Sequence, residues 1–281
     1  MDRRLIEDRL EGLVAENRFT IAVVFPAIGA LLLVGSAEGW VPEPFSFHPT
    51  LILFGTAVMR LPLIAGVLPL LDRRGAIGLL ALTGYAYGIE LIGVQTGLPY
   101  GEFAYLIELG PMLFGDVPLG LPVFFFPLVL NSYLLVVLLL GDRARSTPVR
   151  LLGTLATVLT MDLVLDPGAV GLGFWAYAGG GGYYGVPASN YAGWVVSGAI
   201  SVAIFDRILD GDALVARLGT CGFMLDDLVS FVILWGGVNL YFGHLVPAVL
   251  ALLLGGGLLA TDRFDFAVEP RSLLDRGLHW R

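Results

Sequence analysis

The sequence has few of the residues from which most metal and cofactor sites are built. Its single cysteine, Cys221, excludes an internal disulfide and a cysteine-based metal cluster within the chain. The three histidines form no HExxH motif and no cluster, which argues against a zinc or di-iron site. No glycine-rich phosphate or dinucleotide loop follows a predicted strand, and the GxSxG motif of serine hydrolases is absent. We therefore expect neither a metal nor a cofactor.

Charged residues are also scarce. They make up 14% of the 281 residues, whereas hydrophobic residues make up 57%. A soluble domain of this size has about 25% charged residues, so the composition indicates a membrane protein. The net charge is −8, and each of the 16 basic residues is an arginine. Because an acidic chain is repelled by phosphate backbones, we expect no nucleic-acid partner.

Long apolar runs recur along the chain, each of about 18–24 residues, which is the length that crosses a hydrocarbon layer ~30 Å thick. They predict an all-α, polytopic bundle of eight transmembrane helices, near 19–37, 50–71, 76–96, 118–141, 148–167, 189–206, 223–242 and 244–261. Arginines occur in alternate connections only, with Arg60 as the exception inside a span. The positive-inside rule then places both termini in the cytoplasm. A fallback has seven spans, with one helix broken near Gly243.

The domain organisation follows from these spans. Residues 1–18 are charged and form a cytoplasmic segment or an interfacial helix. Residues 19–262 form a single transmembrane helical domain, and residues 263–281 form a cytoplasmic tail. We expect a multi-pass protein of the cell membrane, with the lipid bilayer as its surroundings.

Five polar residues inside the predicted spans stand out, because a charge there is costly and marks a functional site or a structural ion pair. Asp162 and Asp166 are four residues apart and share one helix face. Glu90 and Asp162 each lie about 14 residues, or about 21 Å, from the inner end of their spans. Arg60 and Asn131 lie in the middle of theirs. We predict that all five converge on one cavity in the middle-to-outer part of the bundle.

Two outer connections, 96–118 and 168–194, are rich in glycine, proline and aromatic residues. Irregular backbone at membrane depth is tolerated where it is buried or lines a cavity. Alternatively, the aromatic residues form an ordinary belt at the membrane interface. On the first interpretation, we predict that these segments contribute substrate-binding residues, namely Tyr100, Glu102, Trp175, Tyr183, Tyr184, Asn190 and Trp194, together with Asn131.

Carboxyl groups in an apolar, aromatic pocket can perform acid–base chemistry without a cofactor. A neutral carboxylic acid can protonate an alkene, and aromatic faces favour the resulting cation. A second carboxylate can then orient and deprotonate water. We predict Asp162 or Glu90 as the acid and Asp166 as the residue that orients water. Arg60 is expected to pair with whichever carboxylate stays ionised.

The DxxxD spacing of Asp162 and Asp166 also occurs in membrane prenyltransferases, where it binds magnesium and diphosphate. That chemistry needs a second aspartate-rich motif facing the same cavity. Asp226 and Asp227 are the nearest candidates, but they are expected at the inner end of their span, at the opposite depth.

Three stretches together resemble the membrane carotenoid-biosynthesis family of carotenoid hydratases, most closely its bacterioruberin-forming branch in halophilic archaea. They are LPYGEFAYLIELGPMLFGDVP, LDPGAVGLGFW and YYGVPASNYAGW, within a likeness that spans roughly 50–245. The resemblance implies that water is added to terminal isopropylidene double bonds of an acyclic carotenoid, giving tertiary alcohols. It implies water as co-substrate and no other cofactor. The implied partners are a hydrophobic carotenoid and other carotenoid-biosynthesis enzymes.

Two alternatives to a hydratase stay open at this stage. One is a membrane prenyltransferase or lycopene elongase-like enzyme, from the aspartate spacing above. The other is a non-enzymatic carotenoid-binding or transport protein. A transporter is expected to show inverted repeats, and the sequence has no convincing ones.

Overall fold

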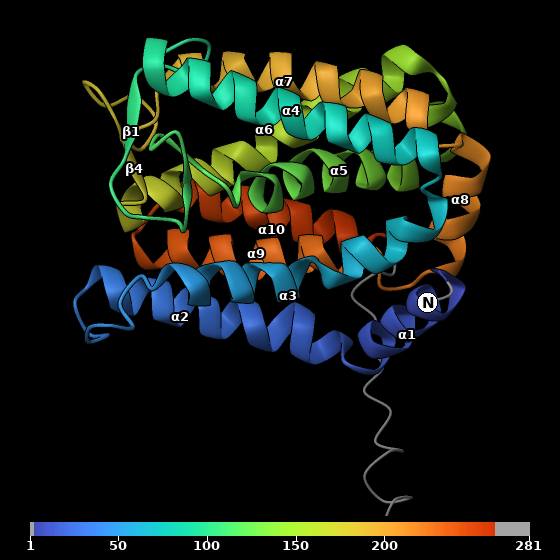
Figure 1. Ribbon diagram of the computed structural model, residues 1–281, viewed down its shortest axis with the longest axis horizontal. Coiled ribbons are helices and arrows are strands. Elements are labelled where there is room, and N and C mark those ends of the chain that lie inside the picture. Colours follow the sequence, from blue (N-terminus) through green and yellow to red (C-terminus); the bar gives the residue numbers. More distant parts are fainter. Residues whose placement is uncertain (1–2, 262–281) are drawn as a thin grey trace, which may run out of the picture.

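The computed structural model describes residues 3–261, so the predicted tail at 263–281 lies outside the described residues. Most helices run side by side along the long axis of the molecule (Figure 1). They are α1 (Arg3–Glu16), α2 (Phe25–Ala37, continuous with a π-helical turn at Thr20–Val24), α3 (Pro49–Val67), α4 (Arg73–Thr96), α5 (Leu121–Leu140), α6 (Thr147–Leu172), α7 (Ala188–Ile208), α8 (Gly211–Thr220), α9 (Asp226–Tyr241) and α10 (Leu245–Leu259).

Within residues 3–261, six helical segments are long and apolar enough to cross a membrane. They are Thr20–Ala37, Pro49–Leu70, Arg73–Thr96, Leu121–Arg145, Thr147–Leu172 and Ala188–Ile208. The last two predicted spans also form helices, but α9 has 16 residues and α10 has 15. The structure thus supports a helical membrane protein, and the predicted count of eight spans is not confirmed.

A tight turn separates α9 from α10. Gly243 adopts a positive φ of 72° between the end of α9 at Tyr241 and the start of α10 at Leu245. The two helices pack as an antiparallel pair, since a Cβ added at Gly236 would lie 3.2 Å from Ala251 Cβ across the turn. They are two helices rather than the single broken helix of the fallback interpretation.

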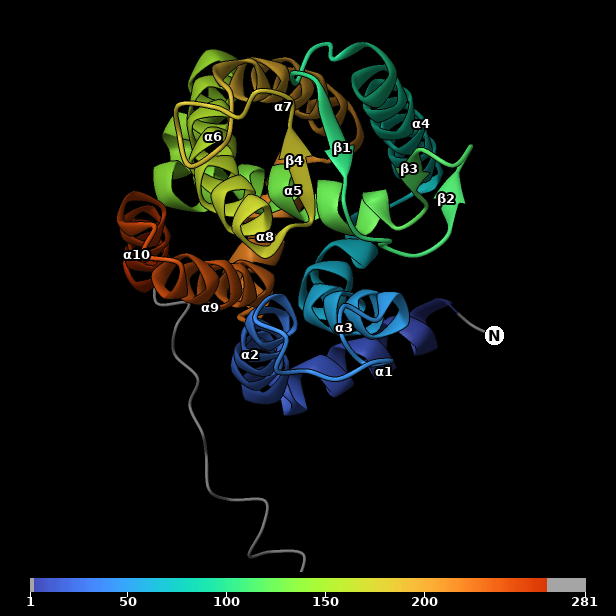
Figure 2. The same ribbon diagram turned by 90° about the vertical axis from the view of Figure 1, so that its left-hand side faces the viewer.

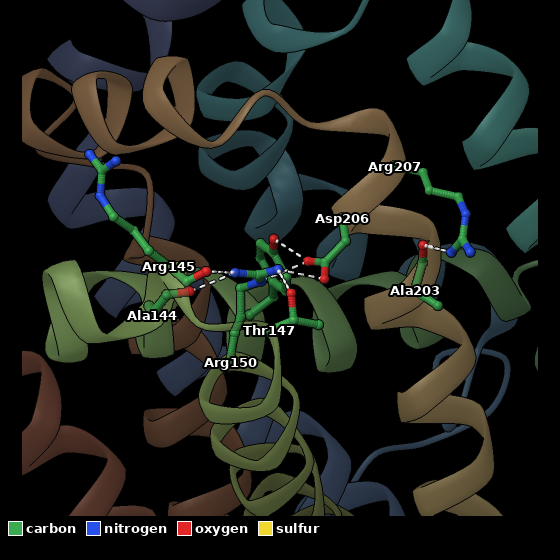
Figure 3. Close-up of polar contacts among 8 residues, drawn as sticks. Ala144, Arg145, Thr147, Arg150, Ala203, Asp206 and Arg207 are labelled. Carbon is green, nitrogen blue, oxygen red and sulfur yellow. Dashed lines mark hydrogen bonds and ion pairs between the residues drawn. The ribbon is translucent and has the colours of Figure 1, made fainter.

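Most arginines among residues 3–261 lie in the segments at one end of the bundle, where α1, α8 and the first turns of α4 and α6 are found (Figure 1). Many of them are tied to carboxylates of other segments. Arg18 bonds Asp226 at 2.7 Å, and Arg150 bonds Asp206 at 2.6 Å (Figure 3). This grouping agrees with the alternation of arginines along the chain.

The segment predicted as cytoplasmic or interfacial forms α1 at the same end. Val14 is fully buried, whereas Leu5 and Leu13 are 43% and 49% exposed. One face of α1 therefore packs on the bundle and another presents apolar side chains outward.

The opposite end of the bundle carries four short strands (Figure 2). Strand β1 (Phe103–Tyr105) pairs antiparallel with β4 (Trp175–Tyr177), with Tyr105 opposite Trp175. Strands β2 (Met112–Leu113) and β3 (Val117–Pro118) pair with each other. The β1–β4 pair joins the two aromatic connections and lies across the centre of this end.

Helix α6 continues past Pro167, where the sequence predicted the end of a span. Proline lacks an N–H and so leaves the carbonyl of Leu163, four residues earlier, without its helical donor. The Tyr183 hydroxyl donates to that carbonyl at 3.2 Å and replaces the missing bond. The helix therefore ends later, at Gly173, which has a left-handed φ of 75°.

A close approach between α7 and the first aromatic connection generates a stability prediction. A Cβ added at Gly193 would overlap the ring of Tyr100, which is itself 4% exposed. Overpacking a well-filled interior costs about 1–3 kcal/mol. We expect Gly193→Ala to lower the thermal unfolding midpoint in detergent.

Gly84→Ala is the matched control for this prediction. Gly84 lies inside α4 with nothing within 4 Å of an added Cβ. Alanine in a helix is favoured over glycine by about 0.5–1 kcal/mol, so this variant should unfold at an equal or higher temperature. Equal midpoints for the two alanine variants would contradict the close packing at Gly193.

Candidate active site

A cavity lies beneath the β1–β4 pair, with about 870 Å³ of empty space including its mouth. The walls come from α4, α5, α6, α7, α9 and the two aromatic connections: Glu90, Tyr100, Phe103, Tyr105, Leu109, Pro118, Leu121, Phe124, Phe125, Leu128, Leu165, Asp166, Phe174, Trp175, Tyr177, Asn190, Trp194 and Trp235. The lining is mostly aromatic and aliphatic, with a few converging polar groups.

Two carboxyl groups reach this cavity, from different helices. Glu90 lines it from α4, and Asp166 lines it from α6. Asp162 lies one turn deeper along α6, is fully buried, and is not part of the lining. Of the three carboxylic acids predicted to be catalytic, two can therefore contact a bound molecule directly.

Asn190, at the start of α7, connects the two aspartates. Its side-chain Nδ2 donates to Asp162 Oδ2 at 2.8 Å and to Asp166 Oδ2 at 2.5 Å. Tyr177 also donates to Asp166 Oδ2, at 3.0 Å. Asp162 Oδ1, in contrast, is buried and has no hydrogen-bond partner among residues 3–261. Asp166 thus accepts two donors, while Asp162 accepts one.

Glu90 has its own phenolic donor. The Tyr105 hydroxyl bonds Glu90 Oε1 at 2.5 Å. Burial raises the pKa of both phenols, Tyr105 and Tyr177, well above their usual value near 10. Both therefore stay protonated at neutral pH and serve as permanent donors to the cavity carboxylates.

Sequence reasoning did not identify Tyr105 and Tyr177. Both lie within the two aromatic connections, 96–118 and 168–194, so composition had indicated the right segments. Their roles depend on the β1–β4 pairing, which sets Tyr105 opposite Trp175 and Phe103 opposite Tyr177. Strands of three residues give no periodicity signal from which such a pairing could be predicted.

Aromatic rings surround the carboxyl groups. Trp194 stacks on Phe125, with ring centroids 5.4 Å apart. Trp175 meets Tyr105 edge-to-face at 6.2 Å. Tyr100 bonds the Ser197 hydroxyl at 2.6 Å, which fixes its ring against α7. Trp175, Trp194, Tyr100 and Asn190 are therefore located where the sequence predicted substrate-binding residues.

Three other predicted binding residues lie away from the cavity lining. Tyr183 is held by the carbonyl of Leu163, as described above. Tyr184 packs against His244, with ring centroids 4.6 Å apart. Glu102 is exposed, and it is held through its backbone carbonyl, which accepts from Ala178 at 2.8 Å. None of the three lines this cavity, although the sequence predicted them as substrate-binding residues.

Arg60 and Asn131 form a separate cluster. Arg60 pairs with Asp227 rather than with Asp162, Asp166 or Glu90, and Asn131 Nδ2 donates to Asp227 Oδ2 at 2.6 Å. The sequence placed Asp227 too far inward for this contact. Helix α9 begins at Asp226 inside the bundle, and a long arginine side chain from α3 spans the remaining difference in depth.

Asp226 and Asp227, the candidates for the second aspartate motif of a prenyltransferase, both form ion pairs with arginines. Asp226 is bonded by Arg18 and Asp227 by Arg60, and neither lines the cavity that contains Asp166. Within the described part of the chain, no group of three or more His, Cys, Asp and Glu side chains is arranged to hold a metal ion. The second aspartate motif that diphosphate binding requires is thus not directed at this cavity.

The shared amide of Asn190 leads to a prediction about stability. Asn190→Leu has similar size but leaves two buried carboxyl groups without this donor. An unsatisfied buried polar group costs about 1–3 kcal/mol, so we expect a clearly lower unfolding midpoint in detergent.

Asn17→Leu provides the control for this variant. The exposed Asn17 donates one bond, to the Leu13 carbonyl at 2.8 Å. Its loss should change the midpoint little, because water can replace the donor. A midpoint for Asn190→Leu as high as that of the control would mean that the amide bridge is not formed.

Comparison with known proteins identifies the family of the chain. The family model described as "Carotenoid biosynthesis protein" matches residues 47–258. A curated relative, "Bisanhydrobacterioruberin hydratase" of Haloarcula japonica, is 64% identical over 265 residues, which cover 94% of this chain and 90% of the relative. No solved structure matches the chain. A match over three quarters of the residues, together with this identity, establishes the family, and the chain belongs to the carotenoid biosynthesis protein family.

Proposed function

We propose that this protein is a carotenoid hydratase, which adds water to the terminal isopropylidene double bonds of bisanhydrobacterioruberin to form bacterioruberin. The observation that carries the proposal is a cavity lined by two carboxyl groups, Glu90 and Asp166, among mostly aromatic and aliphatic side chains. The 64% identity with a protein named for this reaction supports the choice of substrate. By reaction class the enzyme is a hydro-lyase, with water as co-substrate and no cofactor.

The proposed setting is the cell membrane, with eight spans and both ends of the chain in the cytoplasm. The grouping of arginines at one end of the bundle supports this orientation. The antiparallel packing of α9 on α10 supports counting both as spans, although each is short. The cavity then lies in the outer half of the bilayer, where a carotenoid dissolved in lipid can reach it.

The hydrogen bonds favour one assignment of protons. Two carboxyl groups that accept from one amide nitrogen lie too close for both to be ionised readily. Asp166 has two donors to stabilise its negative charge, whereas Asp162 has one donor and an orphaned oxygen. We assign the proton to Asp162 and the charge to Asp166. Asp162 then acts as a positioning residue, and Asp166 as the group that orients water.

Glu90 is assigned as the general acid. Tyr105 holds Oε1, which leaves Oε2 to carry the proton toward the cavity. The proton passes to the CH carbon of the double bond, and the positive charge develops on the carbon that bears two methyl groups. Water attacks that carbon and gives a proton to Asp166, which forms the tertiary alcohol. Proton return from Asp166 to Glu90 restores the starting state.

The surrounding rings support the proposed cation. Aromatic faces attract cations electrostatically, and Trp194, Phe125 and Trp175 line the same cavity as both carboxyl groups. Their apolar surfaces also limit the water that is present, which reduces premature capture of the cation. Each step uses groups of the chain, the alkene and water.

Isotopic water tests the reaction itself. Membranes that contain the protein are incubated with bisanhydrobacterioruberin in H₂¹⁸O, without added cofactor. We expect ¹⁸O in each newly formed hydroxyl group, because the oxygen comes from water. A new hydroxyl without label would exclude hydration.

Neutral variants of the carboxyl groups test the roles. Glu90→Gln and Asp166→Asn should each lower kcat by about 10²–10⁴-fold, the usual contribution of a general acid or base. Asp162→Asn should lower it less, since the amide resembles the neutral acid that we assign there. Turnover is measured on protein purified from the membrane fraction.

Glu108→Gln is the control, because Glu108 is exposed and does not line the cavity. It should retain the activity of the unaltered protein. Full turnover by Glu90→Gln or by Asp166→Asn would remove that residue from the proposed mechanism.

A further inference from the structure

A second cavity adjoins the active-site cavity, between α2, α3, α5 and α9. The two cavities share five lining residues: Phe124, Leu128, Leu165, Phe174 and Trp235. They are therefore neighbouring chambers separated by side chains. Among the described residues that line the second chamber, Arg60 has the only charge.

Arg60 is held in place but retains unused donors. Its Nε donates to the Val123 carbonyl at 3.2 Å, and its Nη1 bonds Asp227, which Asn131 fixes from the other side. Its Nη2 donates to no atom of residues 3–261. The Arg60 side chain is 11% exposed, and it borders the chamber.

Arg150 shows what a purely structural arginine looks like in this protein (Figure 3). It also pairs with a partly buried aspartate, Asp206, which accepts in addition from Tyr133 at 2.8 Å. Every nitrogen of its guanidinium is bonded, through Asp206 and Thr147 and to the carbonyls of Ala144 and Arg145. It lines neither cavity. The open donors of Arg60 are thus a difference between two otherwise similar pairs.

The charge of the cluster limits what these donors can bind. Asp227 already neutralises Arg60, so an anion in the chamber would lie beside a buried carboxylate without a free positive charge. A hydrocarbon offers no acceptor at all. A neutral oxygen with lone pairs satisfies the donors without adding charge.

We propose that the second chamber is a subsite for a neutral hydroxyl oxygen, held by the spare N–H groups of Arg60 next to the reacting end of the substrate. The oxygen belongs either to an alcohol group on the carotenoid or to a water molecule kept near the double bond. The inference rests on the proposed hydration reaction, whose carbon skeleton occupies the neighbouring cavity. Arg60 is accordingly a specificity residue rather than the counter-ion of a catalytic carboxylate.

Binding measurements test the subsite separately from the reaction. Two acyclic carotenoids with the same isopropylidene end are compared, one with an alcohol group near that end and one purely hydrocarbon. Their Kd values are measured by quenching of tryptophan fluorescence, since Trp235 lines both chambers. This readout requires no turnover, so failure of hydration and failure of the subsite are distinguishable.

The variant is R60Q/D227N, which replaces the guanidinium donors with an amide on a shorter side chain and leaves no buried charge unpaired. A hydrogen bond to a charged group is worth roughly tenfold or more in affinity. If the oxygen is an alcohol, Kd for the hydroxylated carotenoid should rise at least about tenfold more than Kd for the hydrocarbon. If the oxygen is water, both Kd values should stay equal to those of the unaltered protein, while the turnover of both substrates falls.

R150Q/D206N is the matched control, with the same exchange in the pair that has no open donors. It should leave the ratio of the two Kd values unchanged, whatever it does to stability. Thr56→Leu provides a variant that keeps both pairs and fills the chamber, because Thr56 lines it. It should reproduce the effect of R60Q/D227N. Unaltered binding and turnover of both carotenoids in Thr56→Leu, or in folded R60Q/D227N, would overturn the proposal.

Discussion

Every carboxyl group buried in this bundle needs a donor, and the positions of those donors determine the architecture of its outer half. Asn190 supplies one amide to two aspartates on α6, and Tyr177 and Tyr105 supply phenols from paired strands. A charge in an apolar interior is costly unless it is paired or hydrogen-bonded. The β1–β4 pair is therefore part of the acid site, since it carries the groups without which the carboxylates could not be buried.

The depth of these groups could be predicted from the sequence, because a helix advances a fixed distance per residue. Glu90 and Asp166 do lie on one cavity, as counting from the helix ends had indicated. The same counting missed the pairing of Arg60 with Asp227, since it placed Asp227 at the inner end of its span and ignored the reach of an arginine side chain. The rotation of each helix about its axis is set by packing, so it cannot be obtained by counting residues from the helix ends.

Irregular segments were the least predictable part of the site. Their composition indicated aromatic walls, and Trp175, Trp194 and Tyr100 are indeed in the cavity lining. Tyr183 belongs to the same kind of stretch, yet its hydroxyl donates to the carbonyl of Leu163, which Pro167 leaves without a helical donor. Whether an aromatic residue faces a cavity or supports a helix depends on which carbonyl groups nearby lack a donor, and this is visible only in three dimensions.

The pairing of β1 with β4 has a consequence for how a long molecule reaches the acid site. Because the two connections are hydrogen-bonded to each other, the outer end of the bundle is spanned by continuous backbone (Figure 2). Under the proposed function, a rigid polyene longer than the cavity would pass sideways between helices, with most of its length remaining among the lipid tails. The enzyme would hold one end of the pigment at a time, so a molecule with two identical ends would have to leave and turn round, or meet a second copy, before its other end could react.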